Sequence, residues 1–105
     1  MLASFSAVPM TKGESVSHLV AESLKIVDAS GLDYQLGPMQ TIVEGEEAAV
    51  METIMQCHRR MRELSDRVLT TITIDDRKGA TGRLRGKVRD VEAQVGKTLK
   101  RVSGE

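Results

Sequence analysis

The order of its periodic segments is the feature that most restricts how this chain can fold. Four short segments rich in β-branched and small apolar residues are bounded by Gly, Pro or acidic residues, which is the pattern of β-strands. These segments are residues 2–8, 34–36, 39–44 and 67–75. Apolar residues recur at helical spacing in three others. These are residues 16–27, 50–64 and 84–102. The order is therefore strand, helix, strand, strand, helix, strand, helix.

This order predicts an α+β fold, a ferredoxin-like βαββαβ sandwich with an added C-terminal helix. Right-handed crossovers favour a four-stranded antiparallel sheet in which the first strand is central. The 105 residues contain no internal repeat, linker or low-complexity segment. We therefore expect one ferredoxin-like domain over residues 1–105.

The only two prolines are each followed by methionine, at Pro9-Met10 and Pro38-Met39. Proline cannot donate a hydrogen bond to a β-ladder, so each pair marks the place where a strand ends or begins. In the predicted topology the first and third strands run antiparallel. Both pairs are therefore expected at one end of the sheet, with residues 44–45 and 75–76 at the other.

Residues alternate along the predicted strands between an apolar face and a face rich in hydroxyl groups. Ser4 and Ser6 share the second face with Thr71 and Thr73, and no Lys or Glu stands in the middle of these strands. Threonine has a high strand propensity, so an exposed face could carry it. The missing charges instead favour a face covered by a second copy of the chain, and we expect a homo-oligomer.

Composition argues against several classes of function. Lys plus Arg and Asp plus Glu both number 15, and aromatic residues make up 2%. Neither a basic field nor base-stacking platforms are present, so nucleic-acid binding is not expected. The lone Cys57 suits a reducing compartment. We expect a cytoplasmic protein, because the first ten residues do not resemble a signal peptide and no apolar run reaches bilayer length.

Residues capable of chemistry do not combine into a catalytic set. Cys57 and His58 are adjacent on a predicted helix and point in different directions, which favours a core cysteine and a surface histidine. Asp75-Asp76 is best explained as a salt-bridged turn. The basic segment Arg77 to Arg89 is not a P-loop, and a solvated helix face is favoured over an anion site. We predict no enzyme activity, metal or cofactor.

Glu44 and Tyr34 each allow two interpretations. Glu44 ends a strand, so it either contacts a ligand or is simply solvated. Tyr34 either stacks on a planar ligand or packs against a helix from an edge strand.

Several motifs in a fixed order resemble the MTH1187/YkoF-like family, also called the thiamine-binding protein family (UPF0045). These motifs are SFSAVPM with GESVS, LDYQLGPMQTIVEGE, and IDDRKG. The resemblance implies a ferredoxin-like fold and self-association into dimers and dimers of dimers, that is, homotetramers. It also implies non-catalytic binding of thiamine or its hydroxymethylpyrimidine half.

An aminopyrimidine needs a hydrogen-bond acceptor, hydroxyl groups and a flat apolar wall. The candidates that could supply these groups are Ser6, Met10, Tyr34, Thr41, Glu44 and Thr71. Because the topology separates Glu44 from Met10, a pocket that contains both requires a subunit interface. The alternative hypothesis is a structural or regulatory self-assembly module without a small-molecule ligand.

Overall fold

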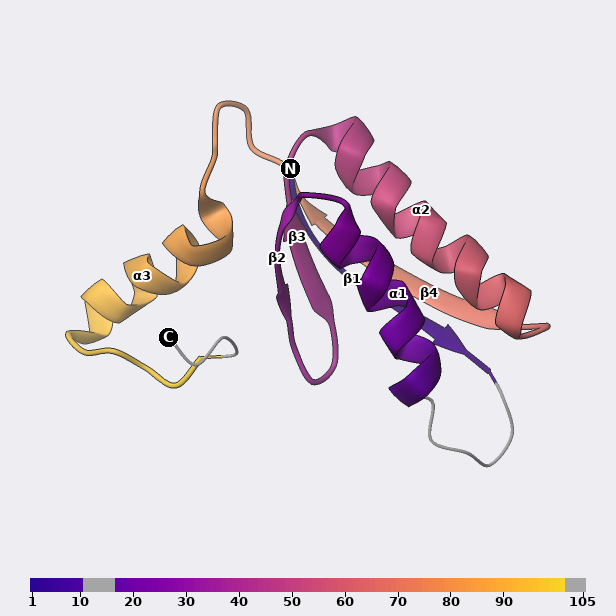
Figure 1. Ribbon diagram of the computed structural model, residues 1–105. Helices are drawn as coiled ribbons and strands as arrows, with labels where there is room; N and C mark the ends of the chain where they lie inside the picture. The colour runs from indigo at the N-terminus through magenta and orange to yellow at the C-terminus, as the bar shows by residue number, and fades with distance from the viewer. Residues whose placement is uncertain (11–16, 102–105) are drawn as a thin grey trace.

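The computed structural model describes residues 1–10 and 17–101. Its elements follow the predicted order (Figure 1). They are β1 (Leu2–Pro9), α1 (Ser17–Ala29), β2 (Asp33–Leu36), β3 (Thr41–Glu44), α2 (Glu47–Leu64), β4 (Val68–Asp75) and α3 (Arg83–Val95). None of the described helices has the length and hydropathy of a membrane span.

The four strands form one antiparallel sheet in the order β2-β3-β1-β4. Helices α1 and α2 pack against each other and cover the same face of this sheet, as Figure 1 shows. This arrangement confirms the ferredoxin-like sandwich with an added C-terminal helix.

The core lies between this face and the two helices, and it contains few aromatic atoms. Phe5 of β1 and Val43 of β3 pack against Ile54 and Cys57 of α2. Burial raises the pKa of the Cys57 thiol to about 11, and its Sγ donates to the carbonyl oxygen of Ser23 at 3.4 Å. Cys57 is therefore a neutral core residue, as the sequence predicted.

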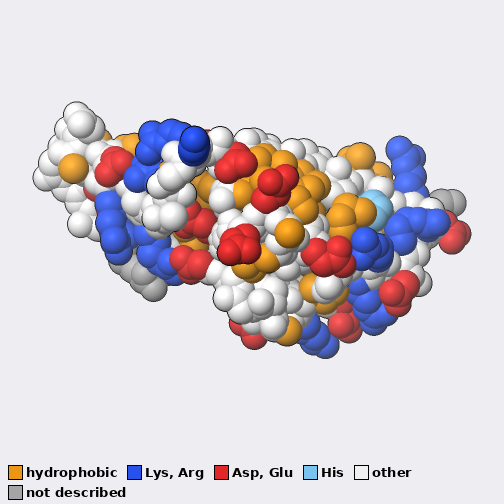
Figure 2. Space-filling view, turned by 90° about the horizontal axis from the view of Figure 1, so that it is seen from above, with side chains coloured by type: hydrophobic (Ala, Val, Ile, Leu, Met, Phe, Trp, Pro, Cys, Tyr) orange, Lys and Arg blue, Asp and Glu red, His pale blue; other side chains and the backbone are white. Residues whose placement is uncertain are grey.

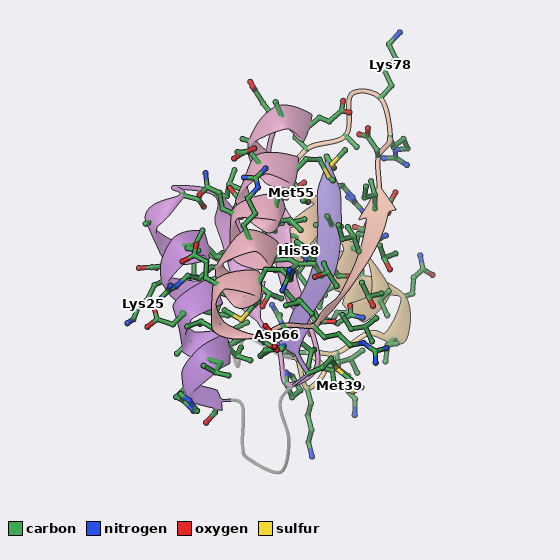
Figure 3. The ribbon with its side chains drawn as sticks, turned by 90° about the vertical axis from the view of Figure 1, so that its right-hand side faces the viewer. Lys25, Met39, Met55, His58, Asp66 and Lys78 are labelled. Carbon is green, nitrogen blue, oxygen red and sulfur yellow. The ribbon has the colours of Figure 1, made fainter. Side chains whose placement is uncertain are left out.

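The strand register confirms how the two ends of the sheet differ. Leu2 pairs with both Glu44 and Asp75, so the acidic strand ends lie together. Pro9 pairs with Val68 at the start of β4, and the hairpin that holds Pro38-Met39 turns beside this second end. In Figure 3, Met39 and Lys78 mark the two opposite ends.

Two predicted boundaries were wrong. Strand β3 begins at Thr41 rather than Met39, because Pro38 and Met39 form the hairpin turn that Gly37 N closes by donating to Gln40 O at 2.9 Å. Helix α3 ends at Val95 rather than at Val102.

The end of α3 follows from Gly96, which adopts the left-handed φ of 88° and donates its N–H to the carbonyl of Glu92. The Glu92 carboxylate then accepts the N–H of Leu99 at 2.6 Å and the guanidinium of Arg101 at 2.7 Å. These bonds turn the chain back along the helix. Val16 and Val102, where the first and third helical patterns begin and end, lie outside the described residues.

Helix α3 is attached to the opposite face of the sheet through its first turns. Gly82 at its N-cap has no side chain to offer, and the carboxylate of Glu44 takes over this role. It accepts the backbone N–H groups of Arg83 at 2.8 Å and Leu84 at 3.0 Å. The negative charge also matches the helix dipole.

Two ion pairs flank this cap. Arg85 of α3 bonds Asp33 of β2 at 2.6 Å, and Lys87 bonds Asp75 of β4. Asp33, Glu44 and Asp75 are level with one another across the sheet. Beyond this anchor α3 projects away from the other helices (Figure 1).

Replacing Glu44 by Ala is expected to release the start of α3, because two helix N–H groups lose their acceptor. We expect a loss of about 1 kcal/mol in unfolding free energy. Faster hydrogen exchange is expected at the amides of Arg83 and Leu84. The control is Glu46→Ala, since Glu46 precedes α2 without making a side-chain cap bond. Unchanged exchange in Glu44→Ala would show that Glu44 does not hold α3.

Candidate functional site

A pocket opens where the β2–β3 hairpin diverges from β1. Strand β1 pairs with β4 along residues 2–9 but with β3 only along residues 2–5. Within the described chain, residues 6–8 therefore have a strand partner on one side only. The edge of β1, the hairpin and α1 surround a cavity of about 200 Å³. We call this cavity the hairpin pocket.

The walls of the hairpin pocket are mainly apolar. Phe5 of β1, Val20 and Leu24 of α1, and Leu36 and Pro38 of the hairpin supply most of this surface. Polar groups come from Ser6, Ser23, Gln40 and Thr41. No charged side chain occurs among the described residues that line the pocket. Such a cavity suits a neutral, flat ligand with a few hydrogen-bonding groups.

Ser23 is the most informative polar residue of the pocket. It is only 3% exposed, and its Oγ has no nitrogen or oxygen partner among the described residues, although its side chain also lowers the pKa of the neighbouring Cys57 thiol by a hydrogen bond. Buried hydroxyl groups are normally satisfied, because an unpaired one costs about 1–3 kcal/mol. The oxygen has almost no accessible surface, so a ligand in the hairpin pocket reaches it only when the Ser23 side chain turns toward the cavity.

Ser23 was missed among the candidates, although its position carried a signal. It stands between Leu19 and Val27 at four-residue spacing, within the apolar stripe of α1. A serine on the buried face of an amphipathic helix needs a partner or a function.

Two of the six sequence candidates reach the hairpin pocket. Thr41 lies on the helix side of the sheet opposite Phe5 and is 6% exposed. Ser6 lines the pocket where β1 has lost its β3 neighbour.

Met10 and Thr71 do not line the hairpin pocket. Met10 follows β1 at the same end of the sheet, where its backbone N–H donates to Arg67 O at 2.8 Å. Thr71 is exposed on the face opposite α1 and α2, where it pairs with Ser6.

Tyr34 and Glu44 also lie elsewhere, and each has a structural partner. Tyr34 packs against the core from edge strand β2, and its hydroxyl donates to Asp28 Oδ1 of α1 at 2.7 Å. This bond raises the pKa of Tyr34. Glu44 caps α3 at the far end of the sheet. Packing is therefore the role that the structure shows for Tyr34, and capping of α3 is the role that it shows for Glu44.

A second hollow of about 200 Å³ lies at that far end and differs in character. Glu44, Asp75, Arg77, Arg83 and Lys87 contribute to its lining. Lys87, followed by Arg77 and Arg83, lowers the pKa of Asp75. Figure 2, which views the molecule from this end, shows acidic and basic side chains intermixed. The carboxylates at the predicted turn are thus ion-paired, but with Lys87 of α3 and the N-terminal amine rather than within the turn itself.

No group of three or more His, Cys, Asp or Glu in the described chain is placed to hold a metal ion. His58 instead has its Nδ1 at 2.6 Å from the hydroxyl oxygen of Thr70, and it lies on α2 away from the hairpin pocket (Figure 3).

The fold and the pocket define the class, an α+β protein with a ferredoxin-like sandwich and a pocket between sheet and helix whose described lining is uncharged. The chain belongs to the thiamine-binding protein family, whose model matches residues 3–92. A UPF0045 protein from Mycobacterium bovis is 34% identical over 93 residues, which cover 88% of this chain and 91% of that protein. The family expected from the motifs is thus confirmed, and its description is one of binding.

Solved structures support the same fold. A hypothetical protein from Methanocaldococcus jannaschii superposes with a TM-score of 0.80 at 26% identity, covering 86% of this chain and 93% of its own. A candidate thiamine biosynthesis/salvage protein from Thermotoga maritima gives a TM-score of 0.74 at 23% identity, with 86% and 96% coverage.

The hydroxyl of Ser23 is expected to contribute nothing to the stability of the ligand-free protein. Ser23→Ala removes an unpaired buried polar group, so thermal unfolding should show an unchanged or raised midpoint. Ser30→Ala is the matched change on the same segment. Ser30 Oγ donates to Val27 O and accepts from Leu32 N, so its loss should cost about 0.5–2 kcal/mol. Equal destabilisation by both variants would show that Ser23 has a structural partner.

Proposed function

We propose that this protein binds thiamine or its hydroxymethylpyrimidine moiety in the hairpin pocket, without catalysis, as a cytoplasmic homo-oligomer. Membership in the thiamine-binding protein family supports the ligand class. The observation that carries the assignment to this pocket is its mainly apolar lining, in which the described residues offer hydroxyl and amide groups and no charged side chain.

The chemistry of an aminopyrimidine matches the groups that the pocket presents. Its amino group donates hydrogen bonds and its ring nitrogens accept them, while a serine or threonine hydroxyl can do both. Thr41 and Ser23 belong to the helix side of the sheet and supply such hydroxyls, whereas Ser6, which shares the opposite face with Thr71, lines the opening at the unpaired edge of β1. Phe5 and Leu24 belong to the apolar walls against which a flat ring can pack.

The acceptor for the amino group is not the carboxylate that the sequence suggested. Glu44 already binds two backbone N–H groups at the other end of the sheet. In our proposal the acceptors are hydroxyl oxygens, the Gln40 amide and backbone carbonyls of residues 6–8, where β3 no longer pairs with β1. A subunit interface is then not needed to join Glu44 to the site.

The chemically reactive side chains support a role in binding rather than in catalysis. Cys57 is fully buried, and its raised pKa keeps the thiol protonated and weakly nucleophilic at neutral pH. His58 faces Thr70 and not Cys57. Neither residue lines the hairpin pocket.

Calorimetry with thiamine and with hydroxymethylpyrimidine tests this function. We expect both to bind with one site per subunit, and Ser23→Ala to weaken both by roughly tenfold, the value of a lost hydrogen bond. Ser30→Ala is the control, because Ser30 lies at the other end of α1 and should leave both affinities unchanged. If the wild-type protein gives neither heat nor a thermal shift with either compound, the assignment is wrong.

The sheet face opposite α1 and α2 supports self-association. Leu69 is 56% exposed there and Val8 36%, among serine and threonine side chains. Exposed apolar side chains together on one sheet face are typical of an interaction surface.

Light scattering at micromolar concentration is expected to show an oligomer. Leu69→Lys should reduce its mass to that of a monomer, because a buried unpaired charge disfavours the interface. Ala49→Lys places the same charge on an exposed position of α2 and should leave the mass unchanged. A wild-type monomer would contradict the proposal. An oligomer that binds neither compound would favour the alternative, a self-assembly module.

A further inference from the structure

We infer that α3 covers the open sheet face of a second copy of this chain, while the α3 of that copy covers the same face here. One surface is an apolar stripe of α3, formed by Val88, Val91 and Val95. The other is the sheet face opposite α1 and α2, where Val8 and Leu69 are exposed. This inference rests on the self-association in the proposed function, and it assigns the surfaces that meet.

Within the described chain, the apolar stripe of α3 is covered only at its beginning. Leu84 is 5% exposed and lies in the turn that Glu44 caps. Val88, Val91 and Val95 continue the stripe at three- and four-residue spacing. Val91 and Val95 are more than half exposed, and Val88 and Val91 line a groove of about 540 Å³. An amphipathic helix buries its stripe against another element, so this part of α3 requires a partner.

The chain does not bring its own α3 to the exposed part of its sheet face. The helix is anchored at the end where Leu2 pairs with Asp75, and it projects away from the sheet (Figure 1). Val8 pairs with Leu69 six residues further along β1. That distance is about 20 Å at the spacing of a strand. A two-fold axis between two copies brings each stripe to the other sheet face, so both contacts form together.

The charge of the chain is divided between the same two parts. Residues 77–101 contain nine basic and two acidic residues, a net charge of +7. The rest of the chain contains six basic and thirteen acidic residues, a net charge of −7. Figure 2 shows a group of basic side chains on the left, over α3. The pairs of Arg85 with Asp33 and of Lys87 with Asp75 neutralise two charges of each part.

This division favours a contact between α3 and the body of another copy. Opposite net charges steer the two surfaces together, whereas two α3 helices repel each other. A second copy therefore supplies both an apolar face for the valines and the opposite charge for the residues around them.

Light scattering on Val95→Glu tests the stripe. The mass is expected to fall to that of a monomer at micromolar concentration, because the contact would bury an unpaired charge. Ala93→Glu is the matched control, since Ala93 is exposed on the other side of the same helix and should leave the mass unchanged. Circular dichroism checks that both variants remain folded. An oligomer of unchanged mass in Val95→Glu would overturn the inference.

Mixing two monomeric variants tests whether the stripe and the face meet each other. Leu69→Lys retains an intact stripe and Val95→Glu retains an intact sheet face. An equimolar mixture should therefore form a mixed dimer, with one wild-type contact and one in which Lys faces Glu. If the mixture remains monomeric, the two surfaces do not meet and the inference is wrong.

Salt tests the contribution of charge. Raising NaCl from about 50 mM to about 500 mM should increase the apparent dissociation constant of the wild-type dimer roughly three- to tenfold, because salt screens the attraction. An unchanged constant would contradict the role of the divided charge. If the wild-type protein is a monomer that binds vesicles of anionic phospholipid, a lipid surface covers α3 instead. A wild-type monomer that binds thiamine would separate failure of the assembly from failure of the proposed ligand.

Discussion

The early end of the β1–β3 ladder is the constraint on which the site depends. Pairing stops at Phe5 and Thr41, while β1 continues beside β4 to Pro9. Pro38 has no N–H with which to extend the ladder, and the turn that it starts leads the hairpin away from β1. The resulting gap leaves one backbone edge of β1 unpaired beneath α1. This gap is the hairpin pocket.

The two ends of the sheet carry two different kinds of surface. At the hairpin end the described lining is uncharged, and an unpaired hydroxyl lies among apolar side chains. At the far end carboxylates from three strands meet the cations and N–H groups of α3. A carboxylate at the hairpin end would favour a cationic ligand. At the far end the carboxylate of Glu44 instead replaces the side-chain cap that Gly82 cannot provide.

The fold could be predicted from the sequence because its signals are local and repeat. Strand alternation and helical stripes gave the element order, and antiparallel geometry then placed both Pro-Met pairs at one end. The start of β3 was missed because methionine fits a strand by composition, and only the Gly37–Gln40 bond assigns it to the turn. The end of α3 was missed because Leu99 continues the apolar spacing beyond Gly96.

The site was harder to predict, because its key features depend on tertiary contacts. Ser6 and Thr41, which line the hairpin pocket, were chosen as candidates for their hydroxyl groups, whereas Ser23 was not among the candidates. Glu44 was singled out because it ends a strand rather than opening a helix. Its partners, however, are backbone groups of residues 83 and 84, which no side-chain pattern reveals.

The anchor of α3 also makes this helix sensitive to strand register. Asp33, Glu44 and Asp75 come from three different strands and stand level only when both ladders are correctly aligned. A slip of one residue in any strand would turn its carboxylate to the opposite face. Correct docking of α3 therefore requires a correctly aligned sheet, so the last helix acts as a check on assembly of the strands before it.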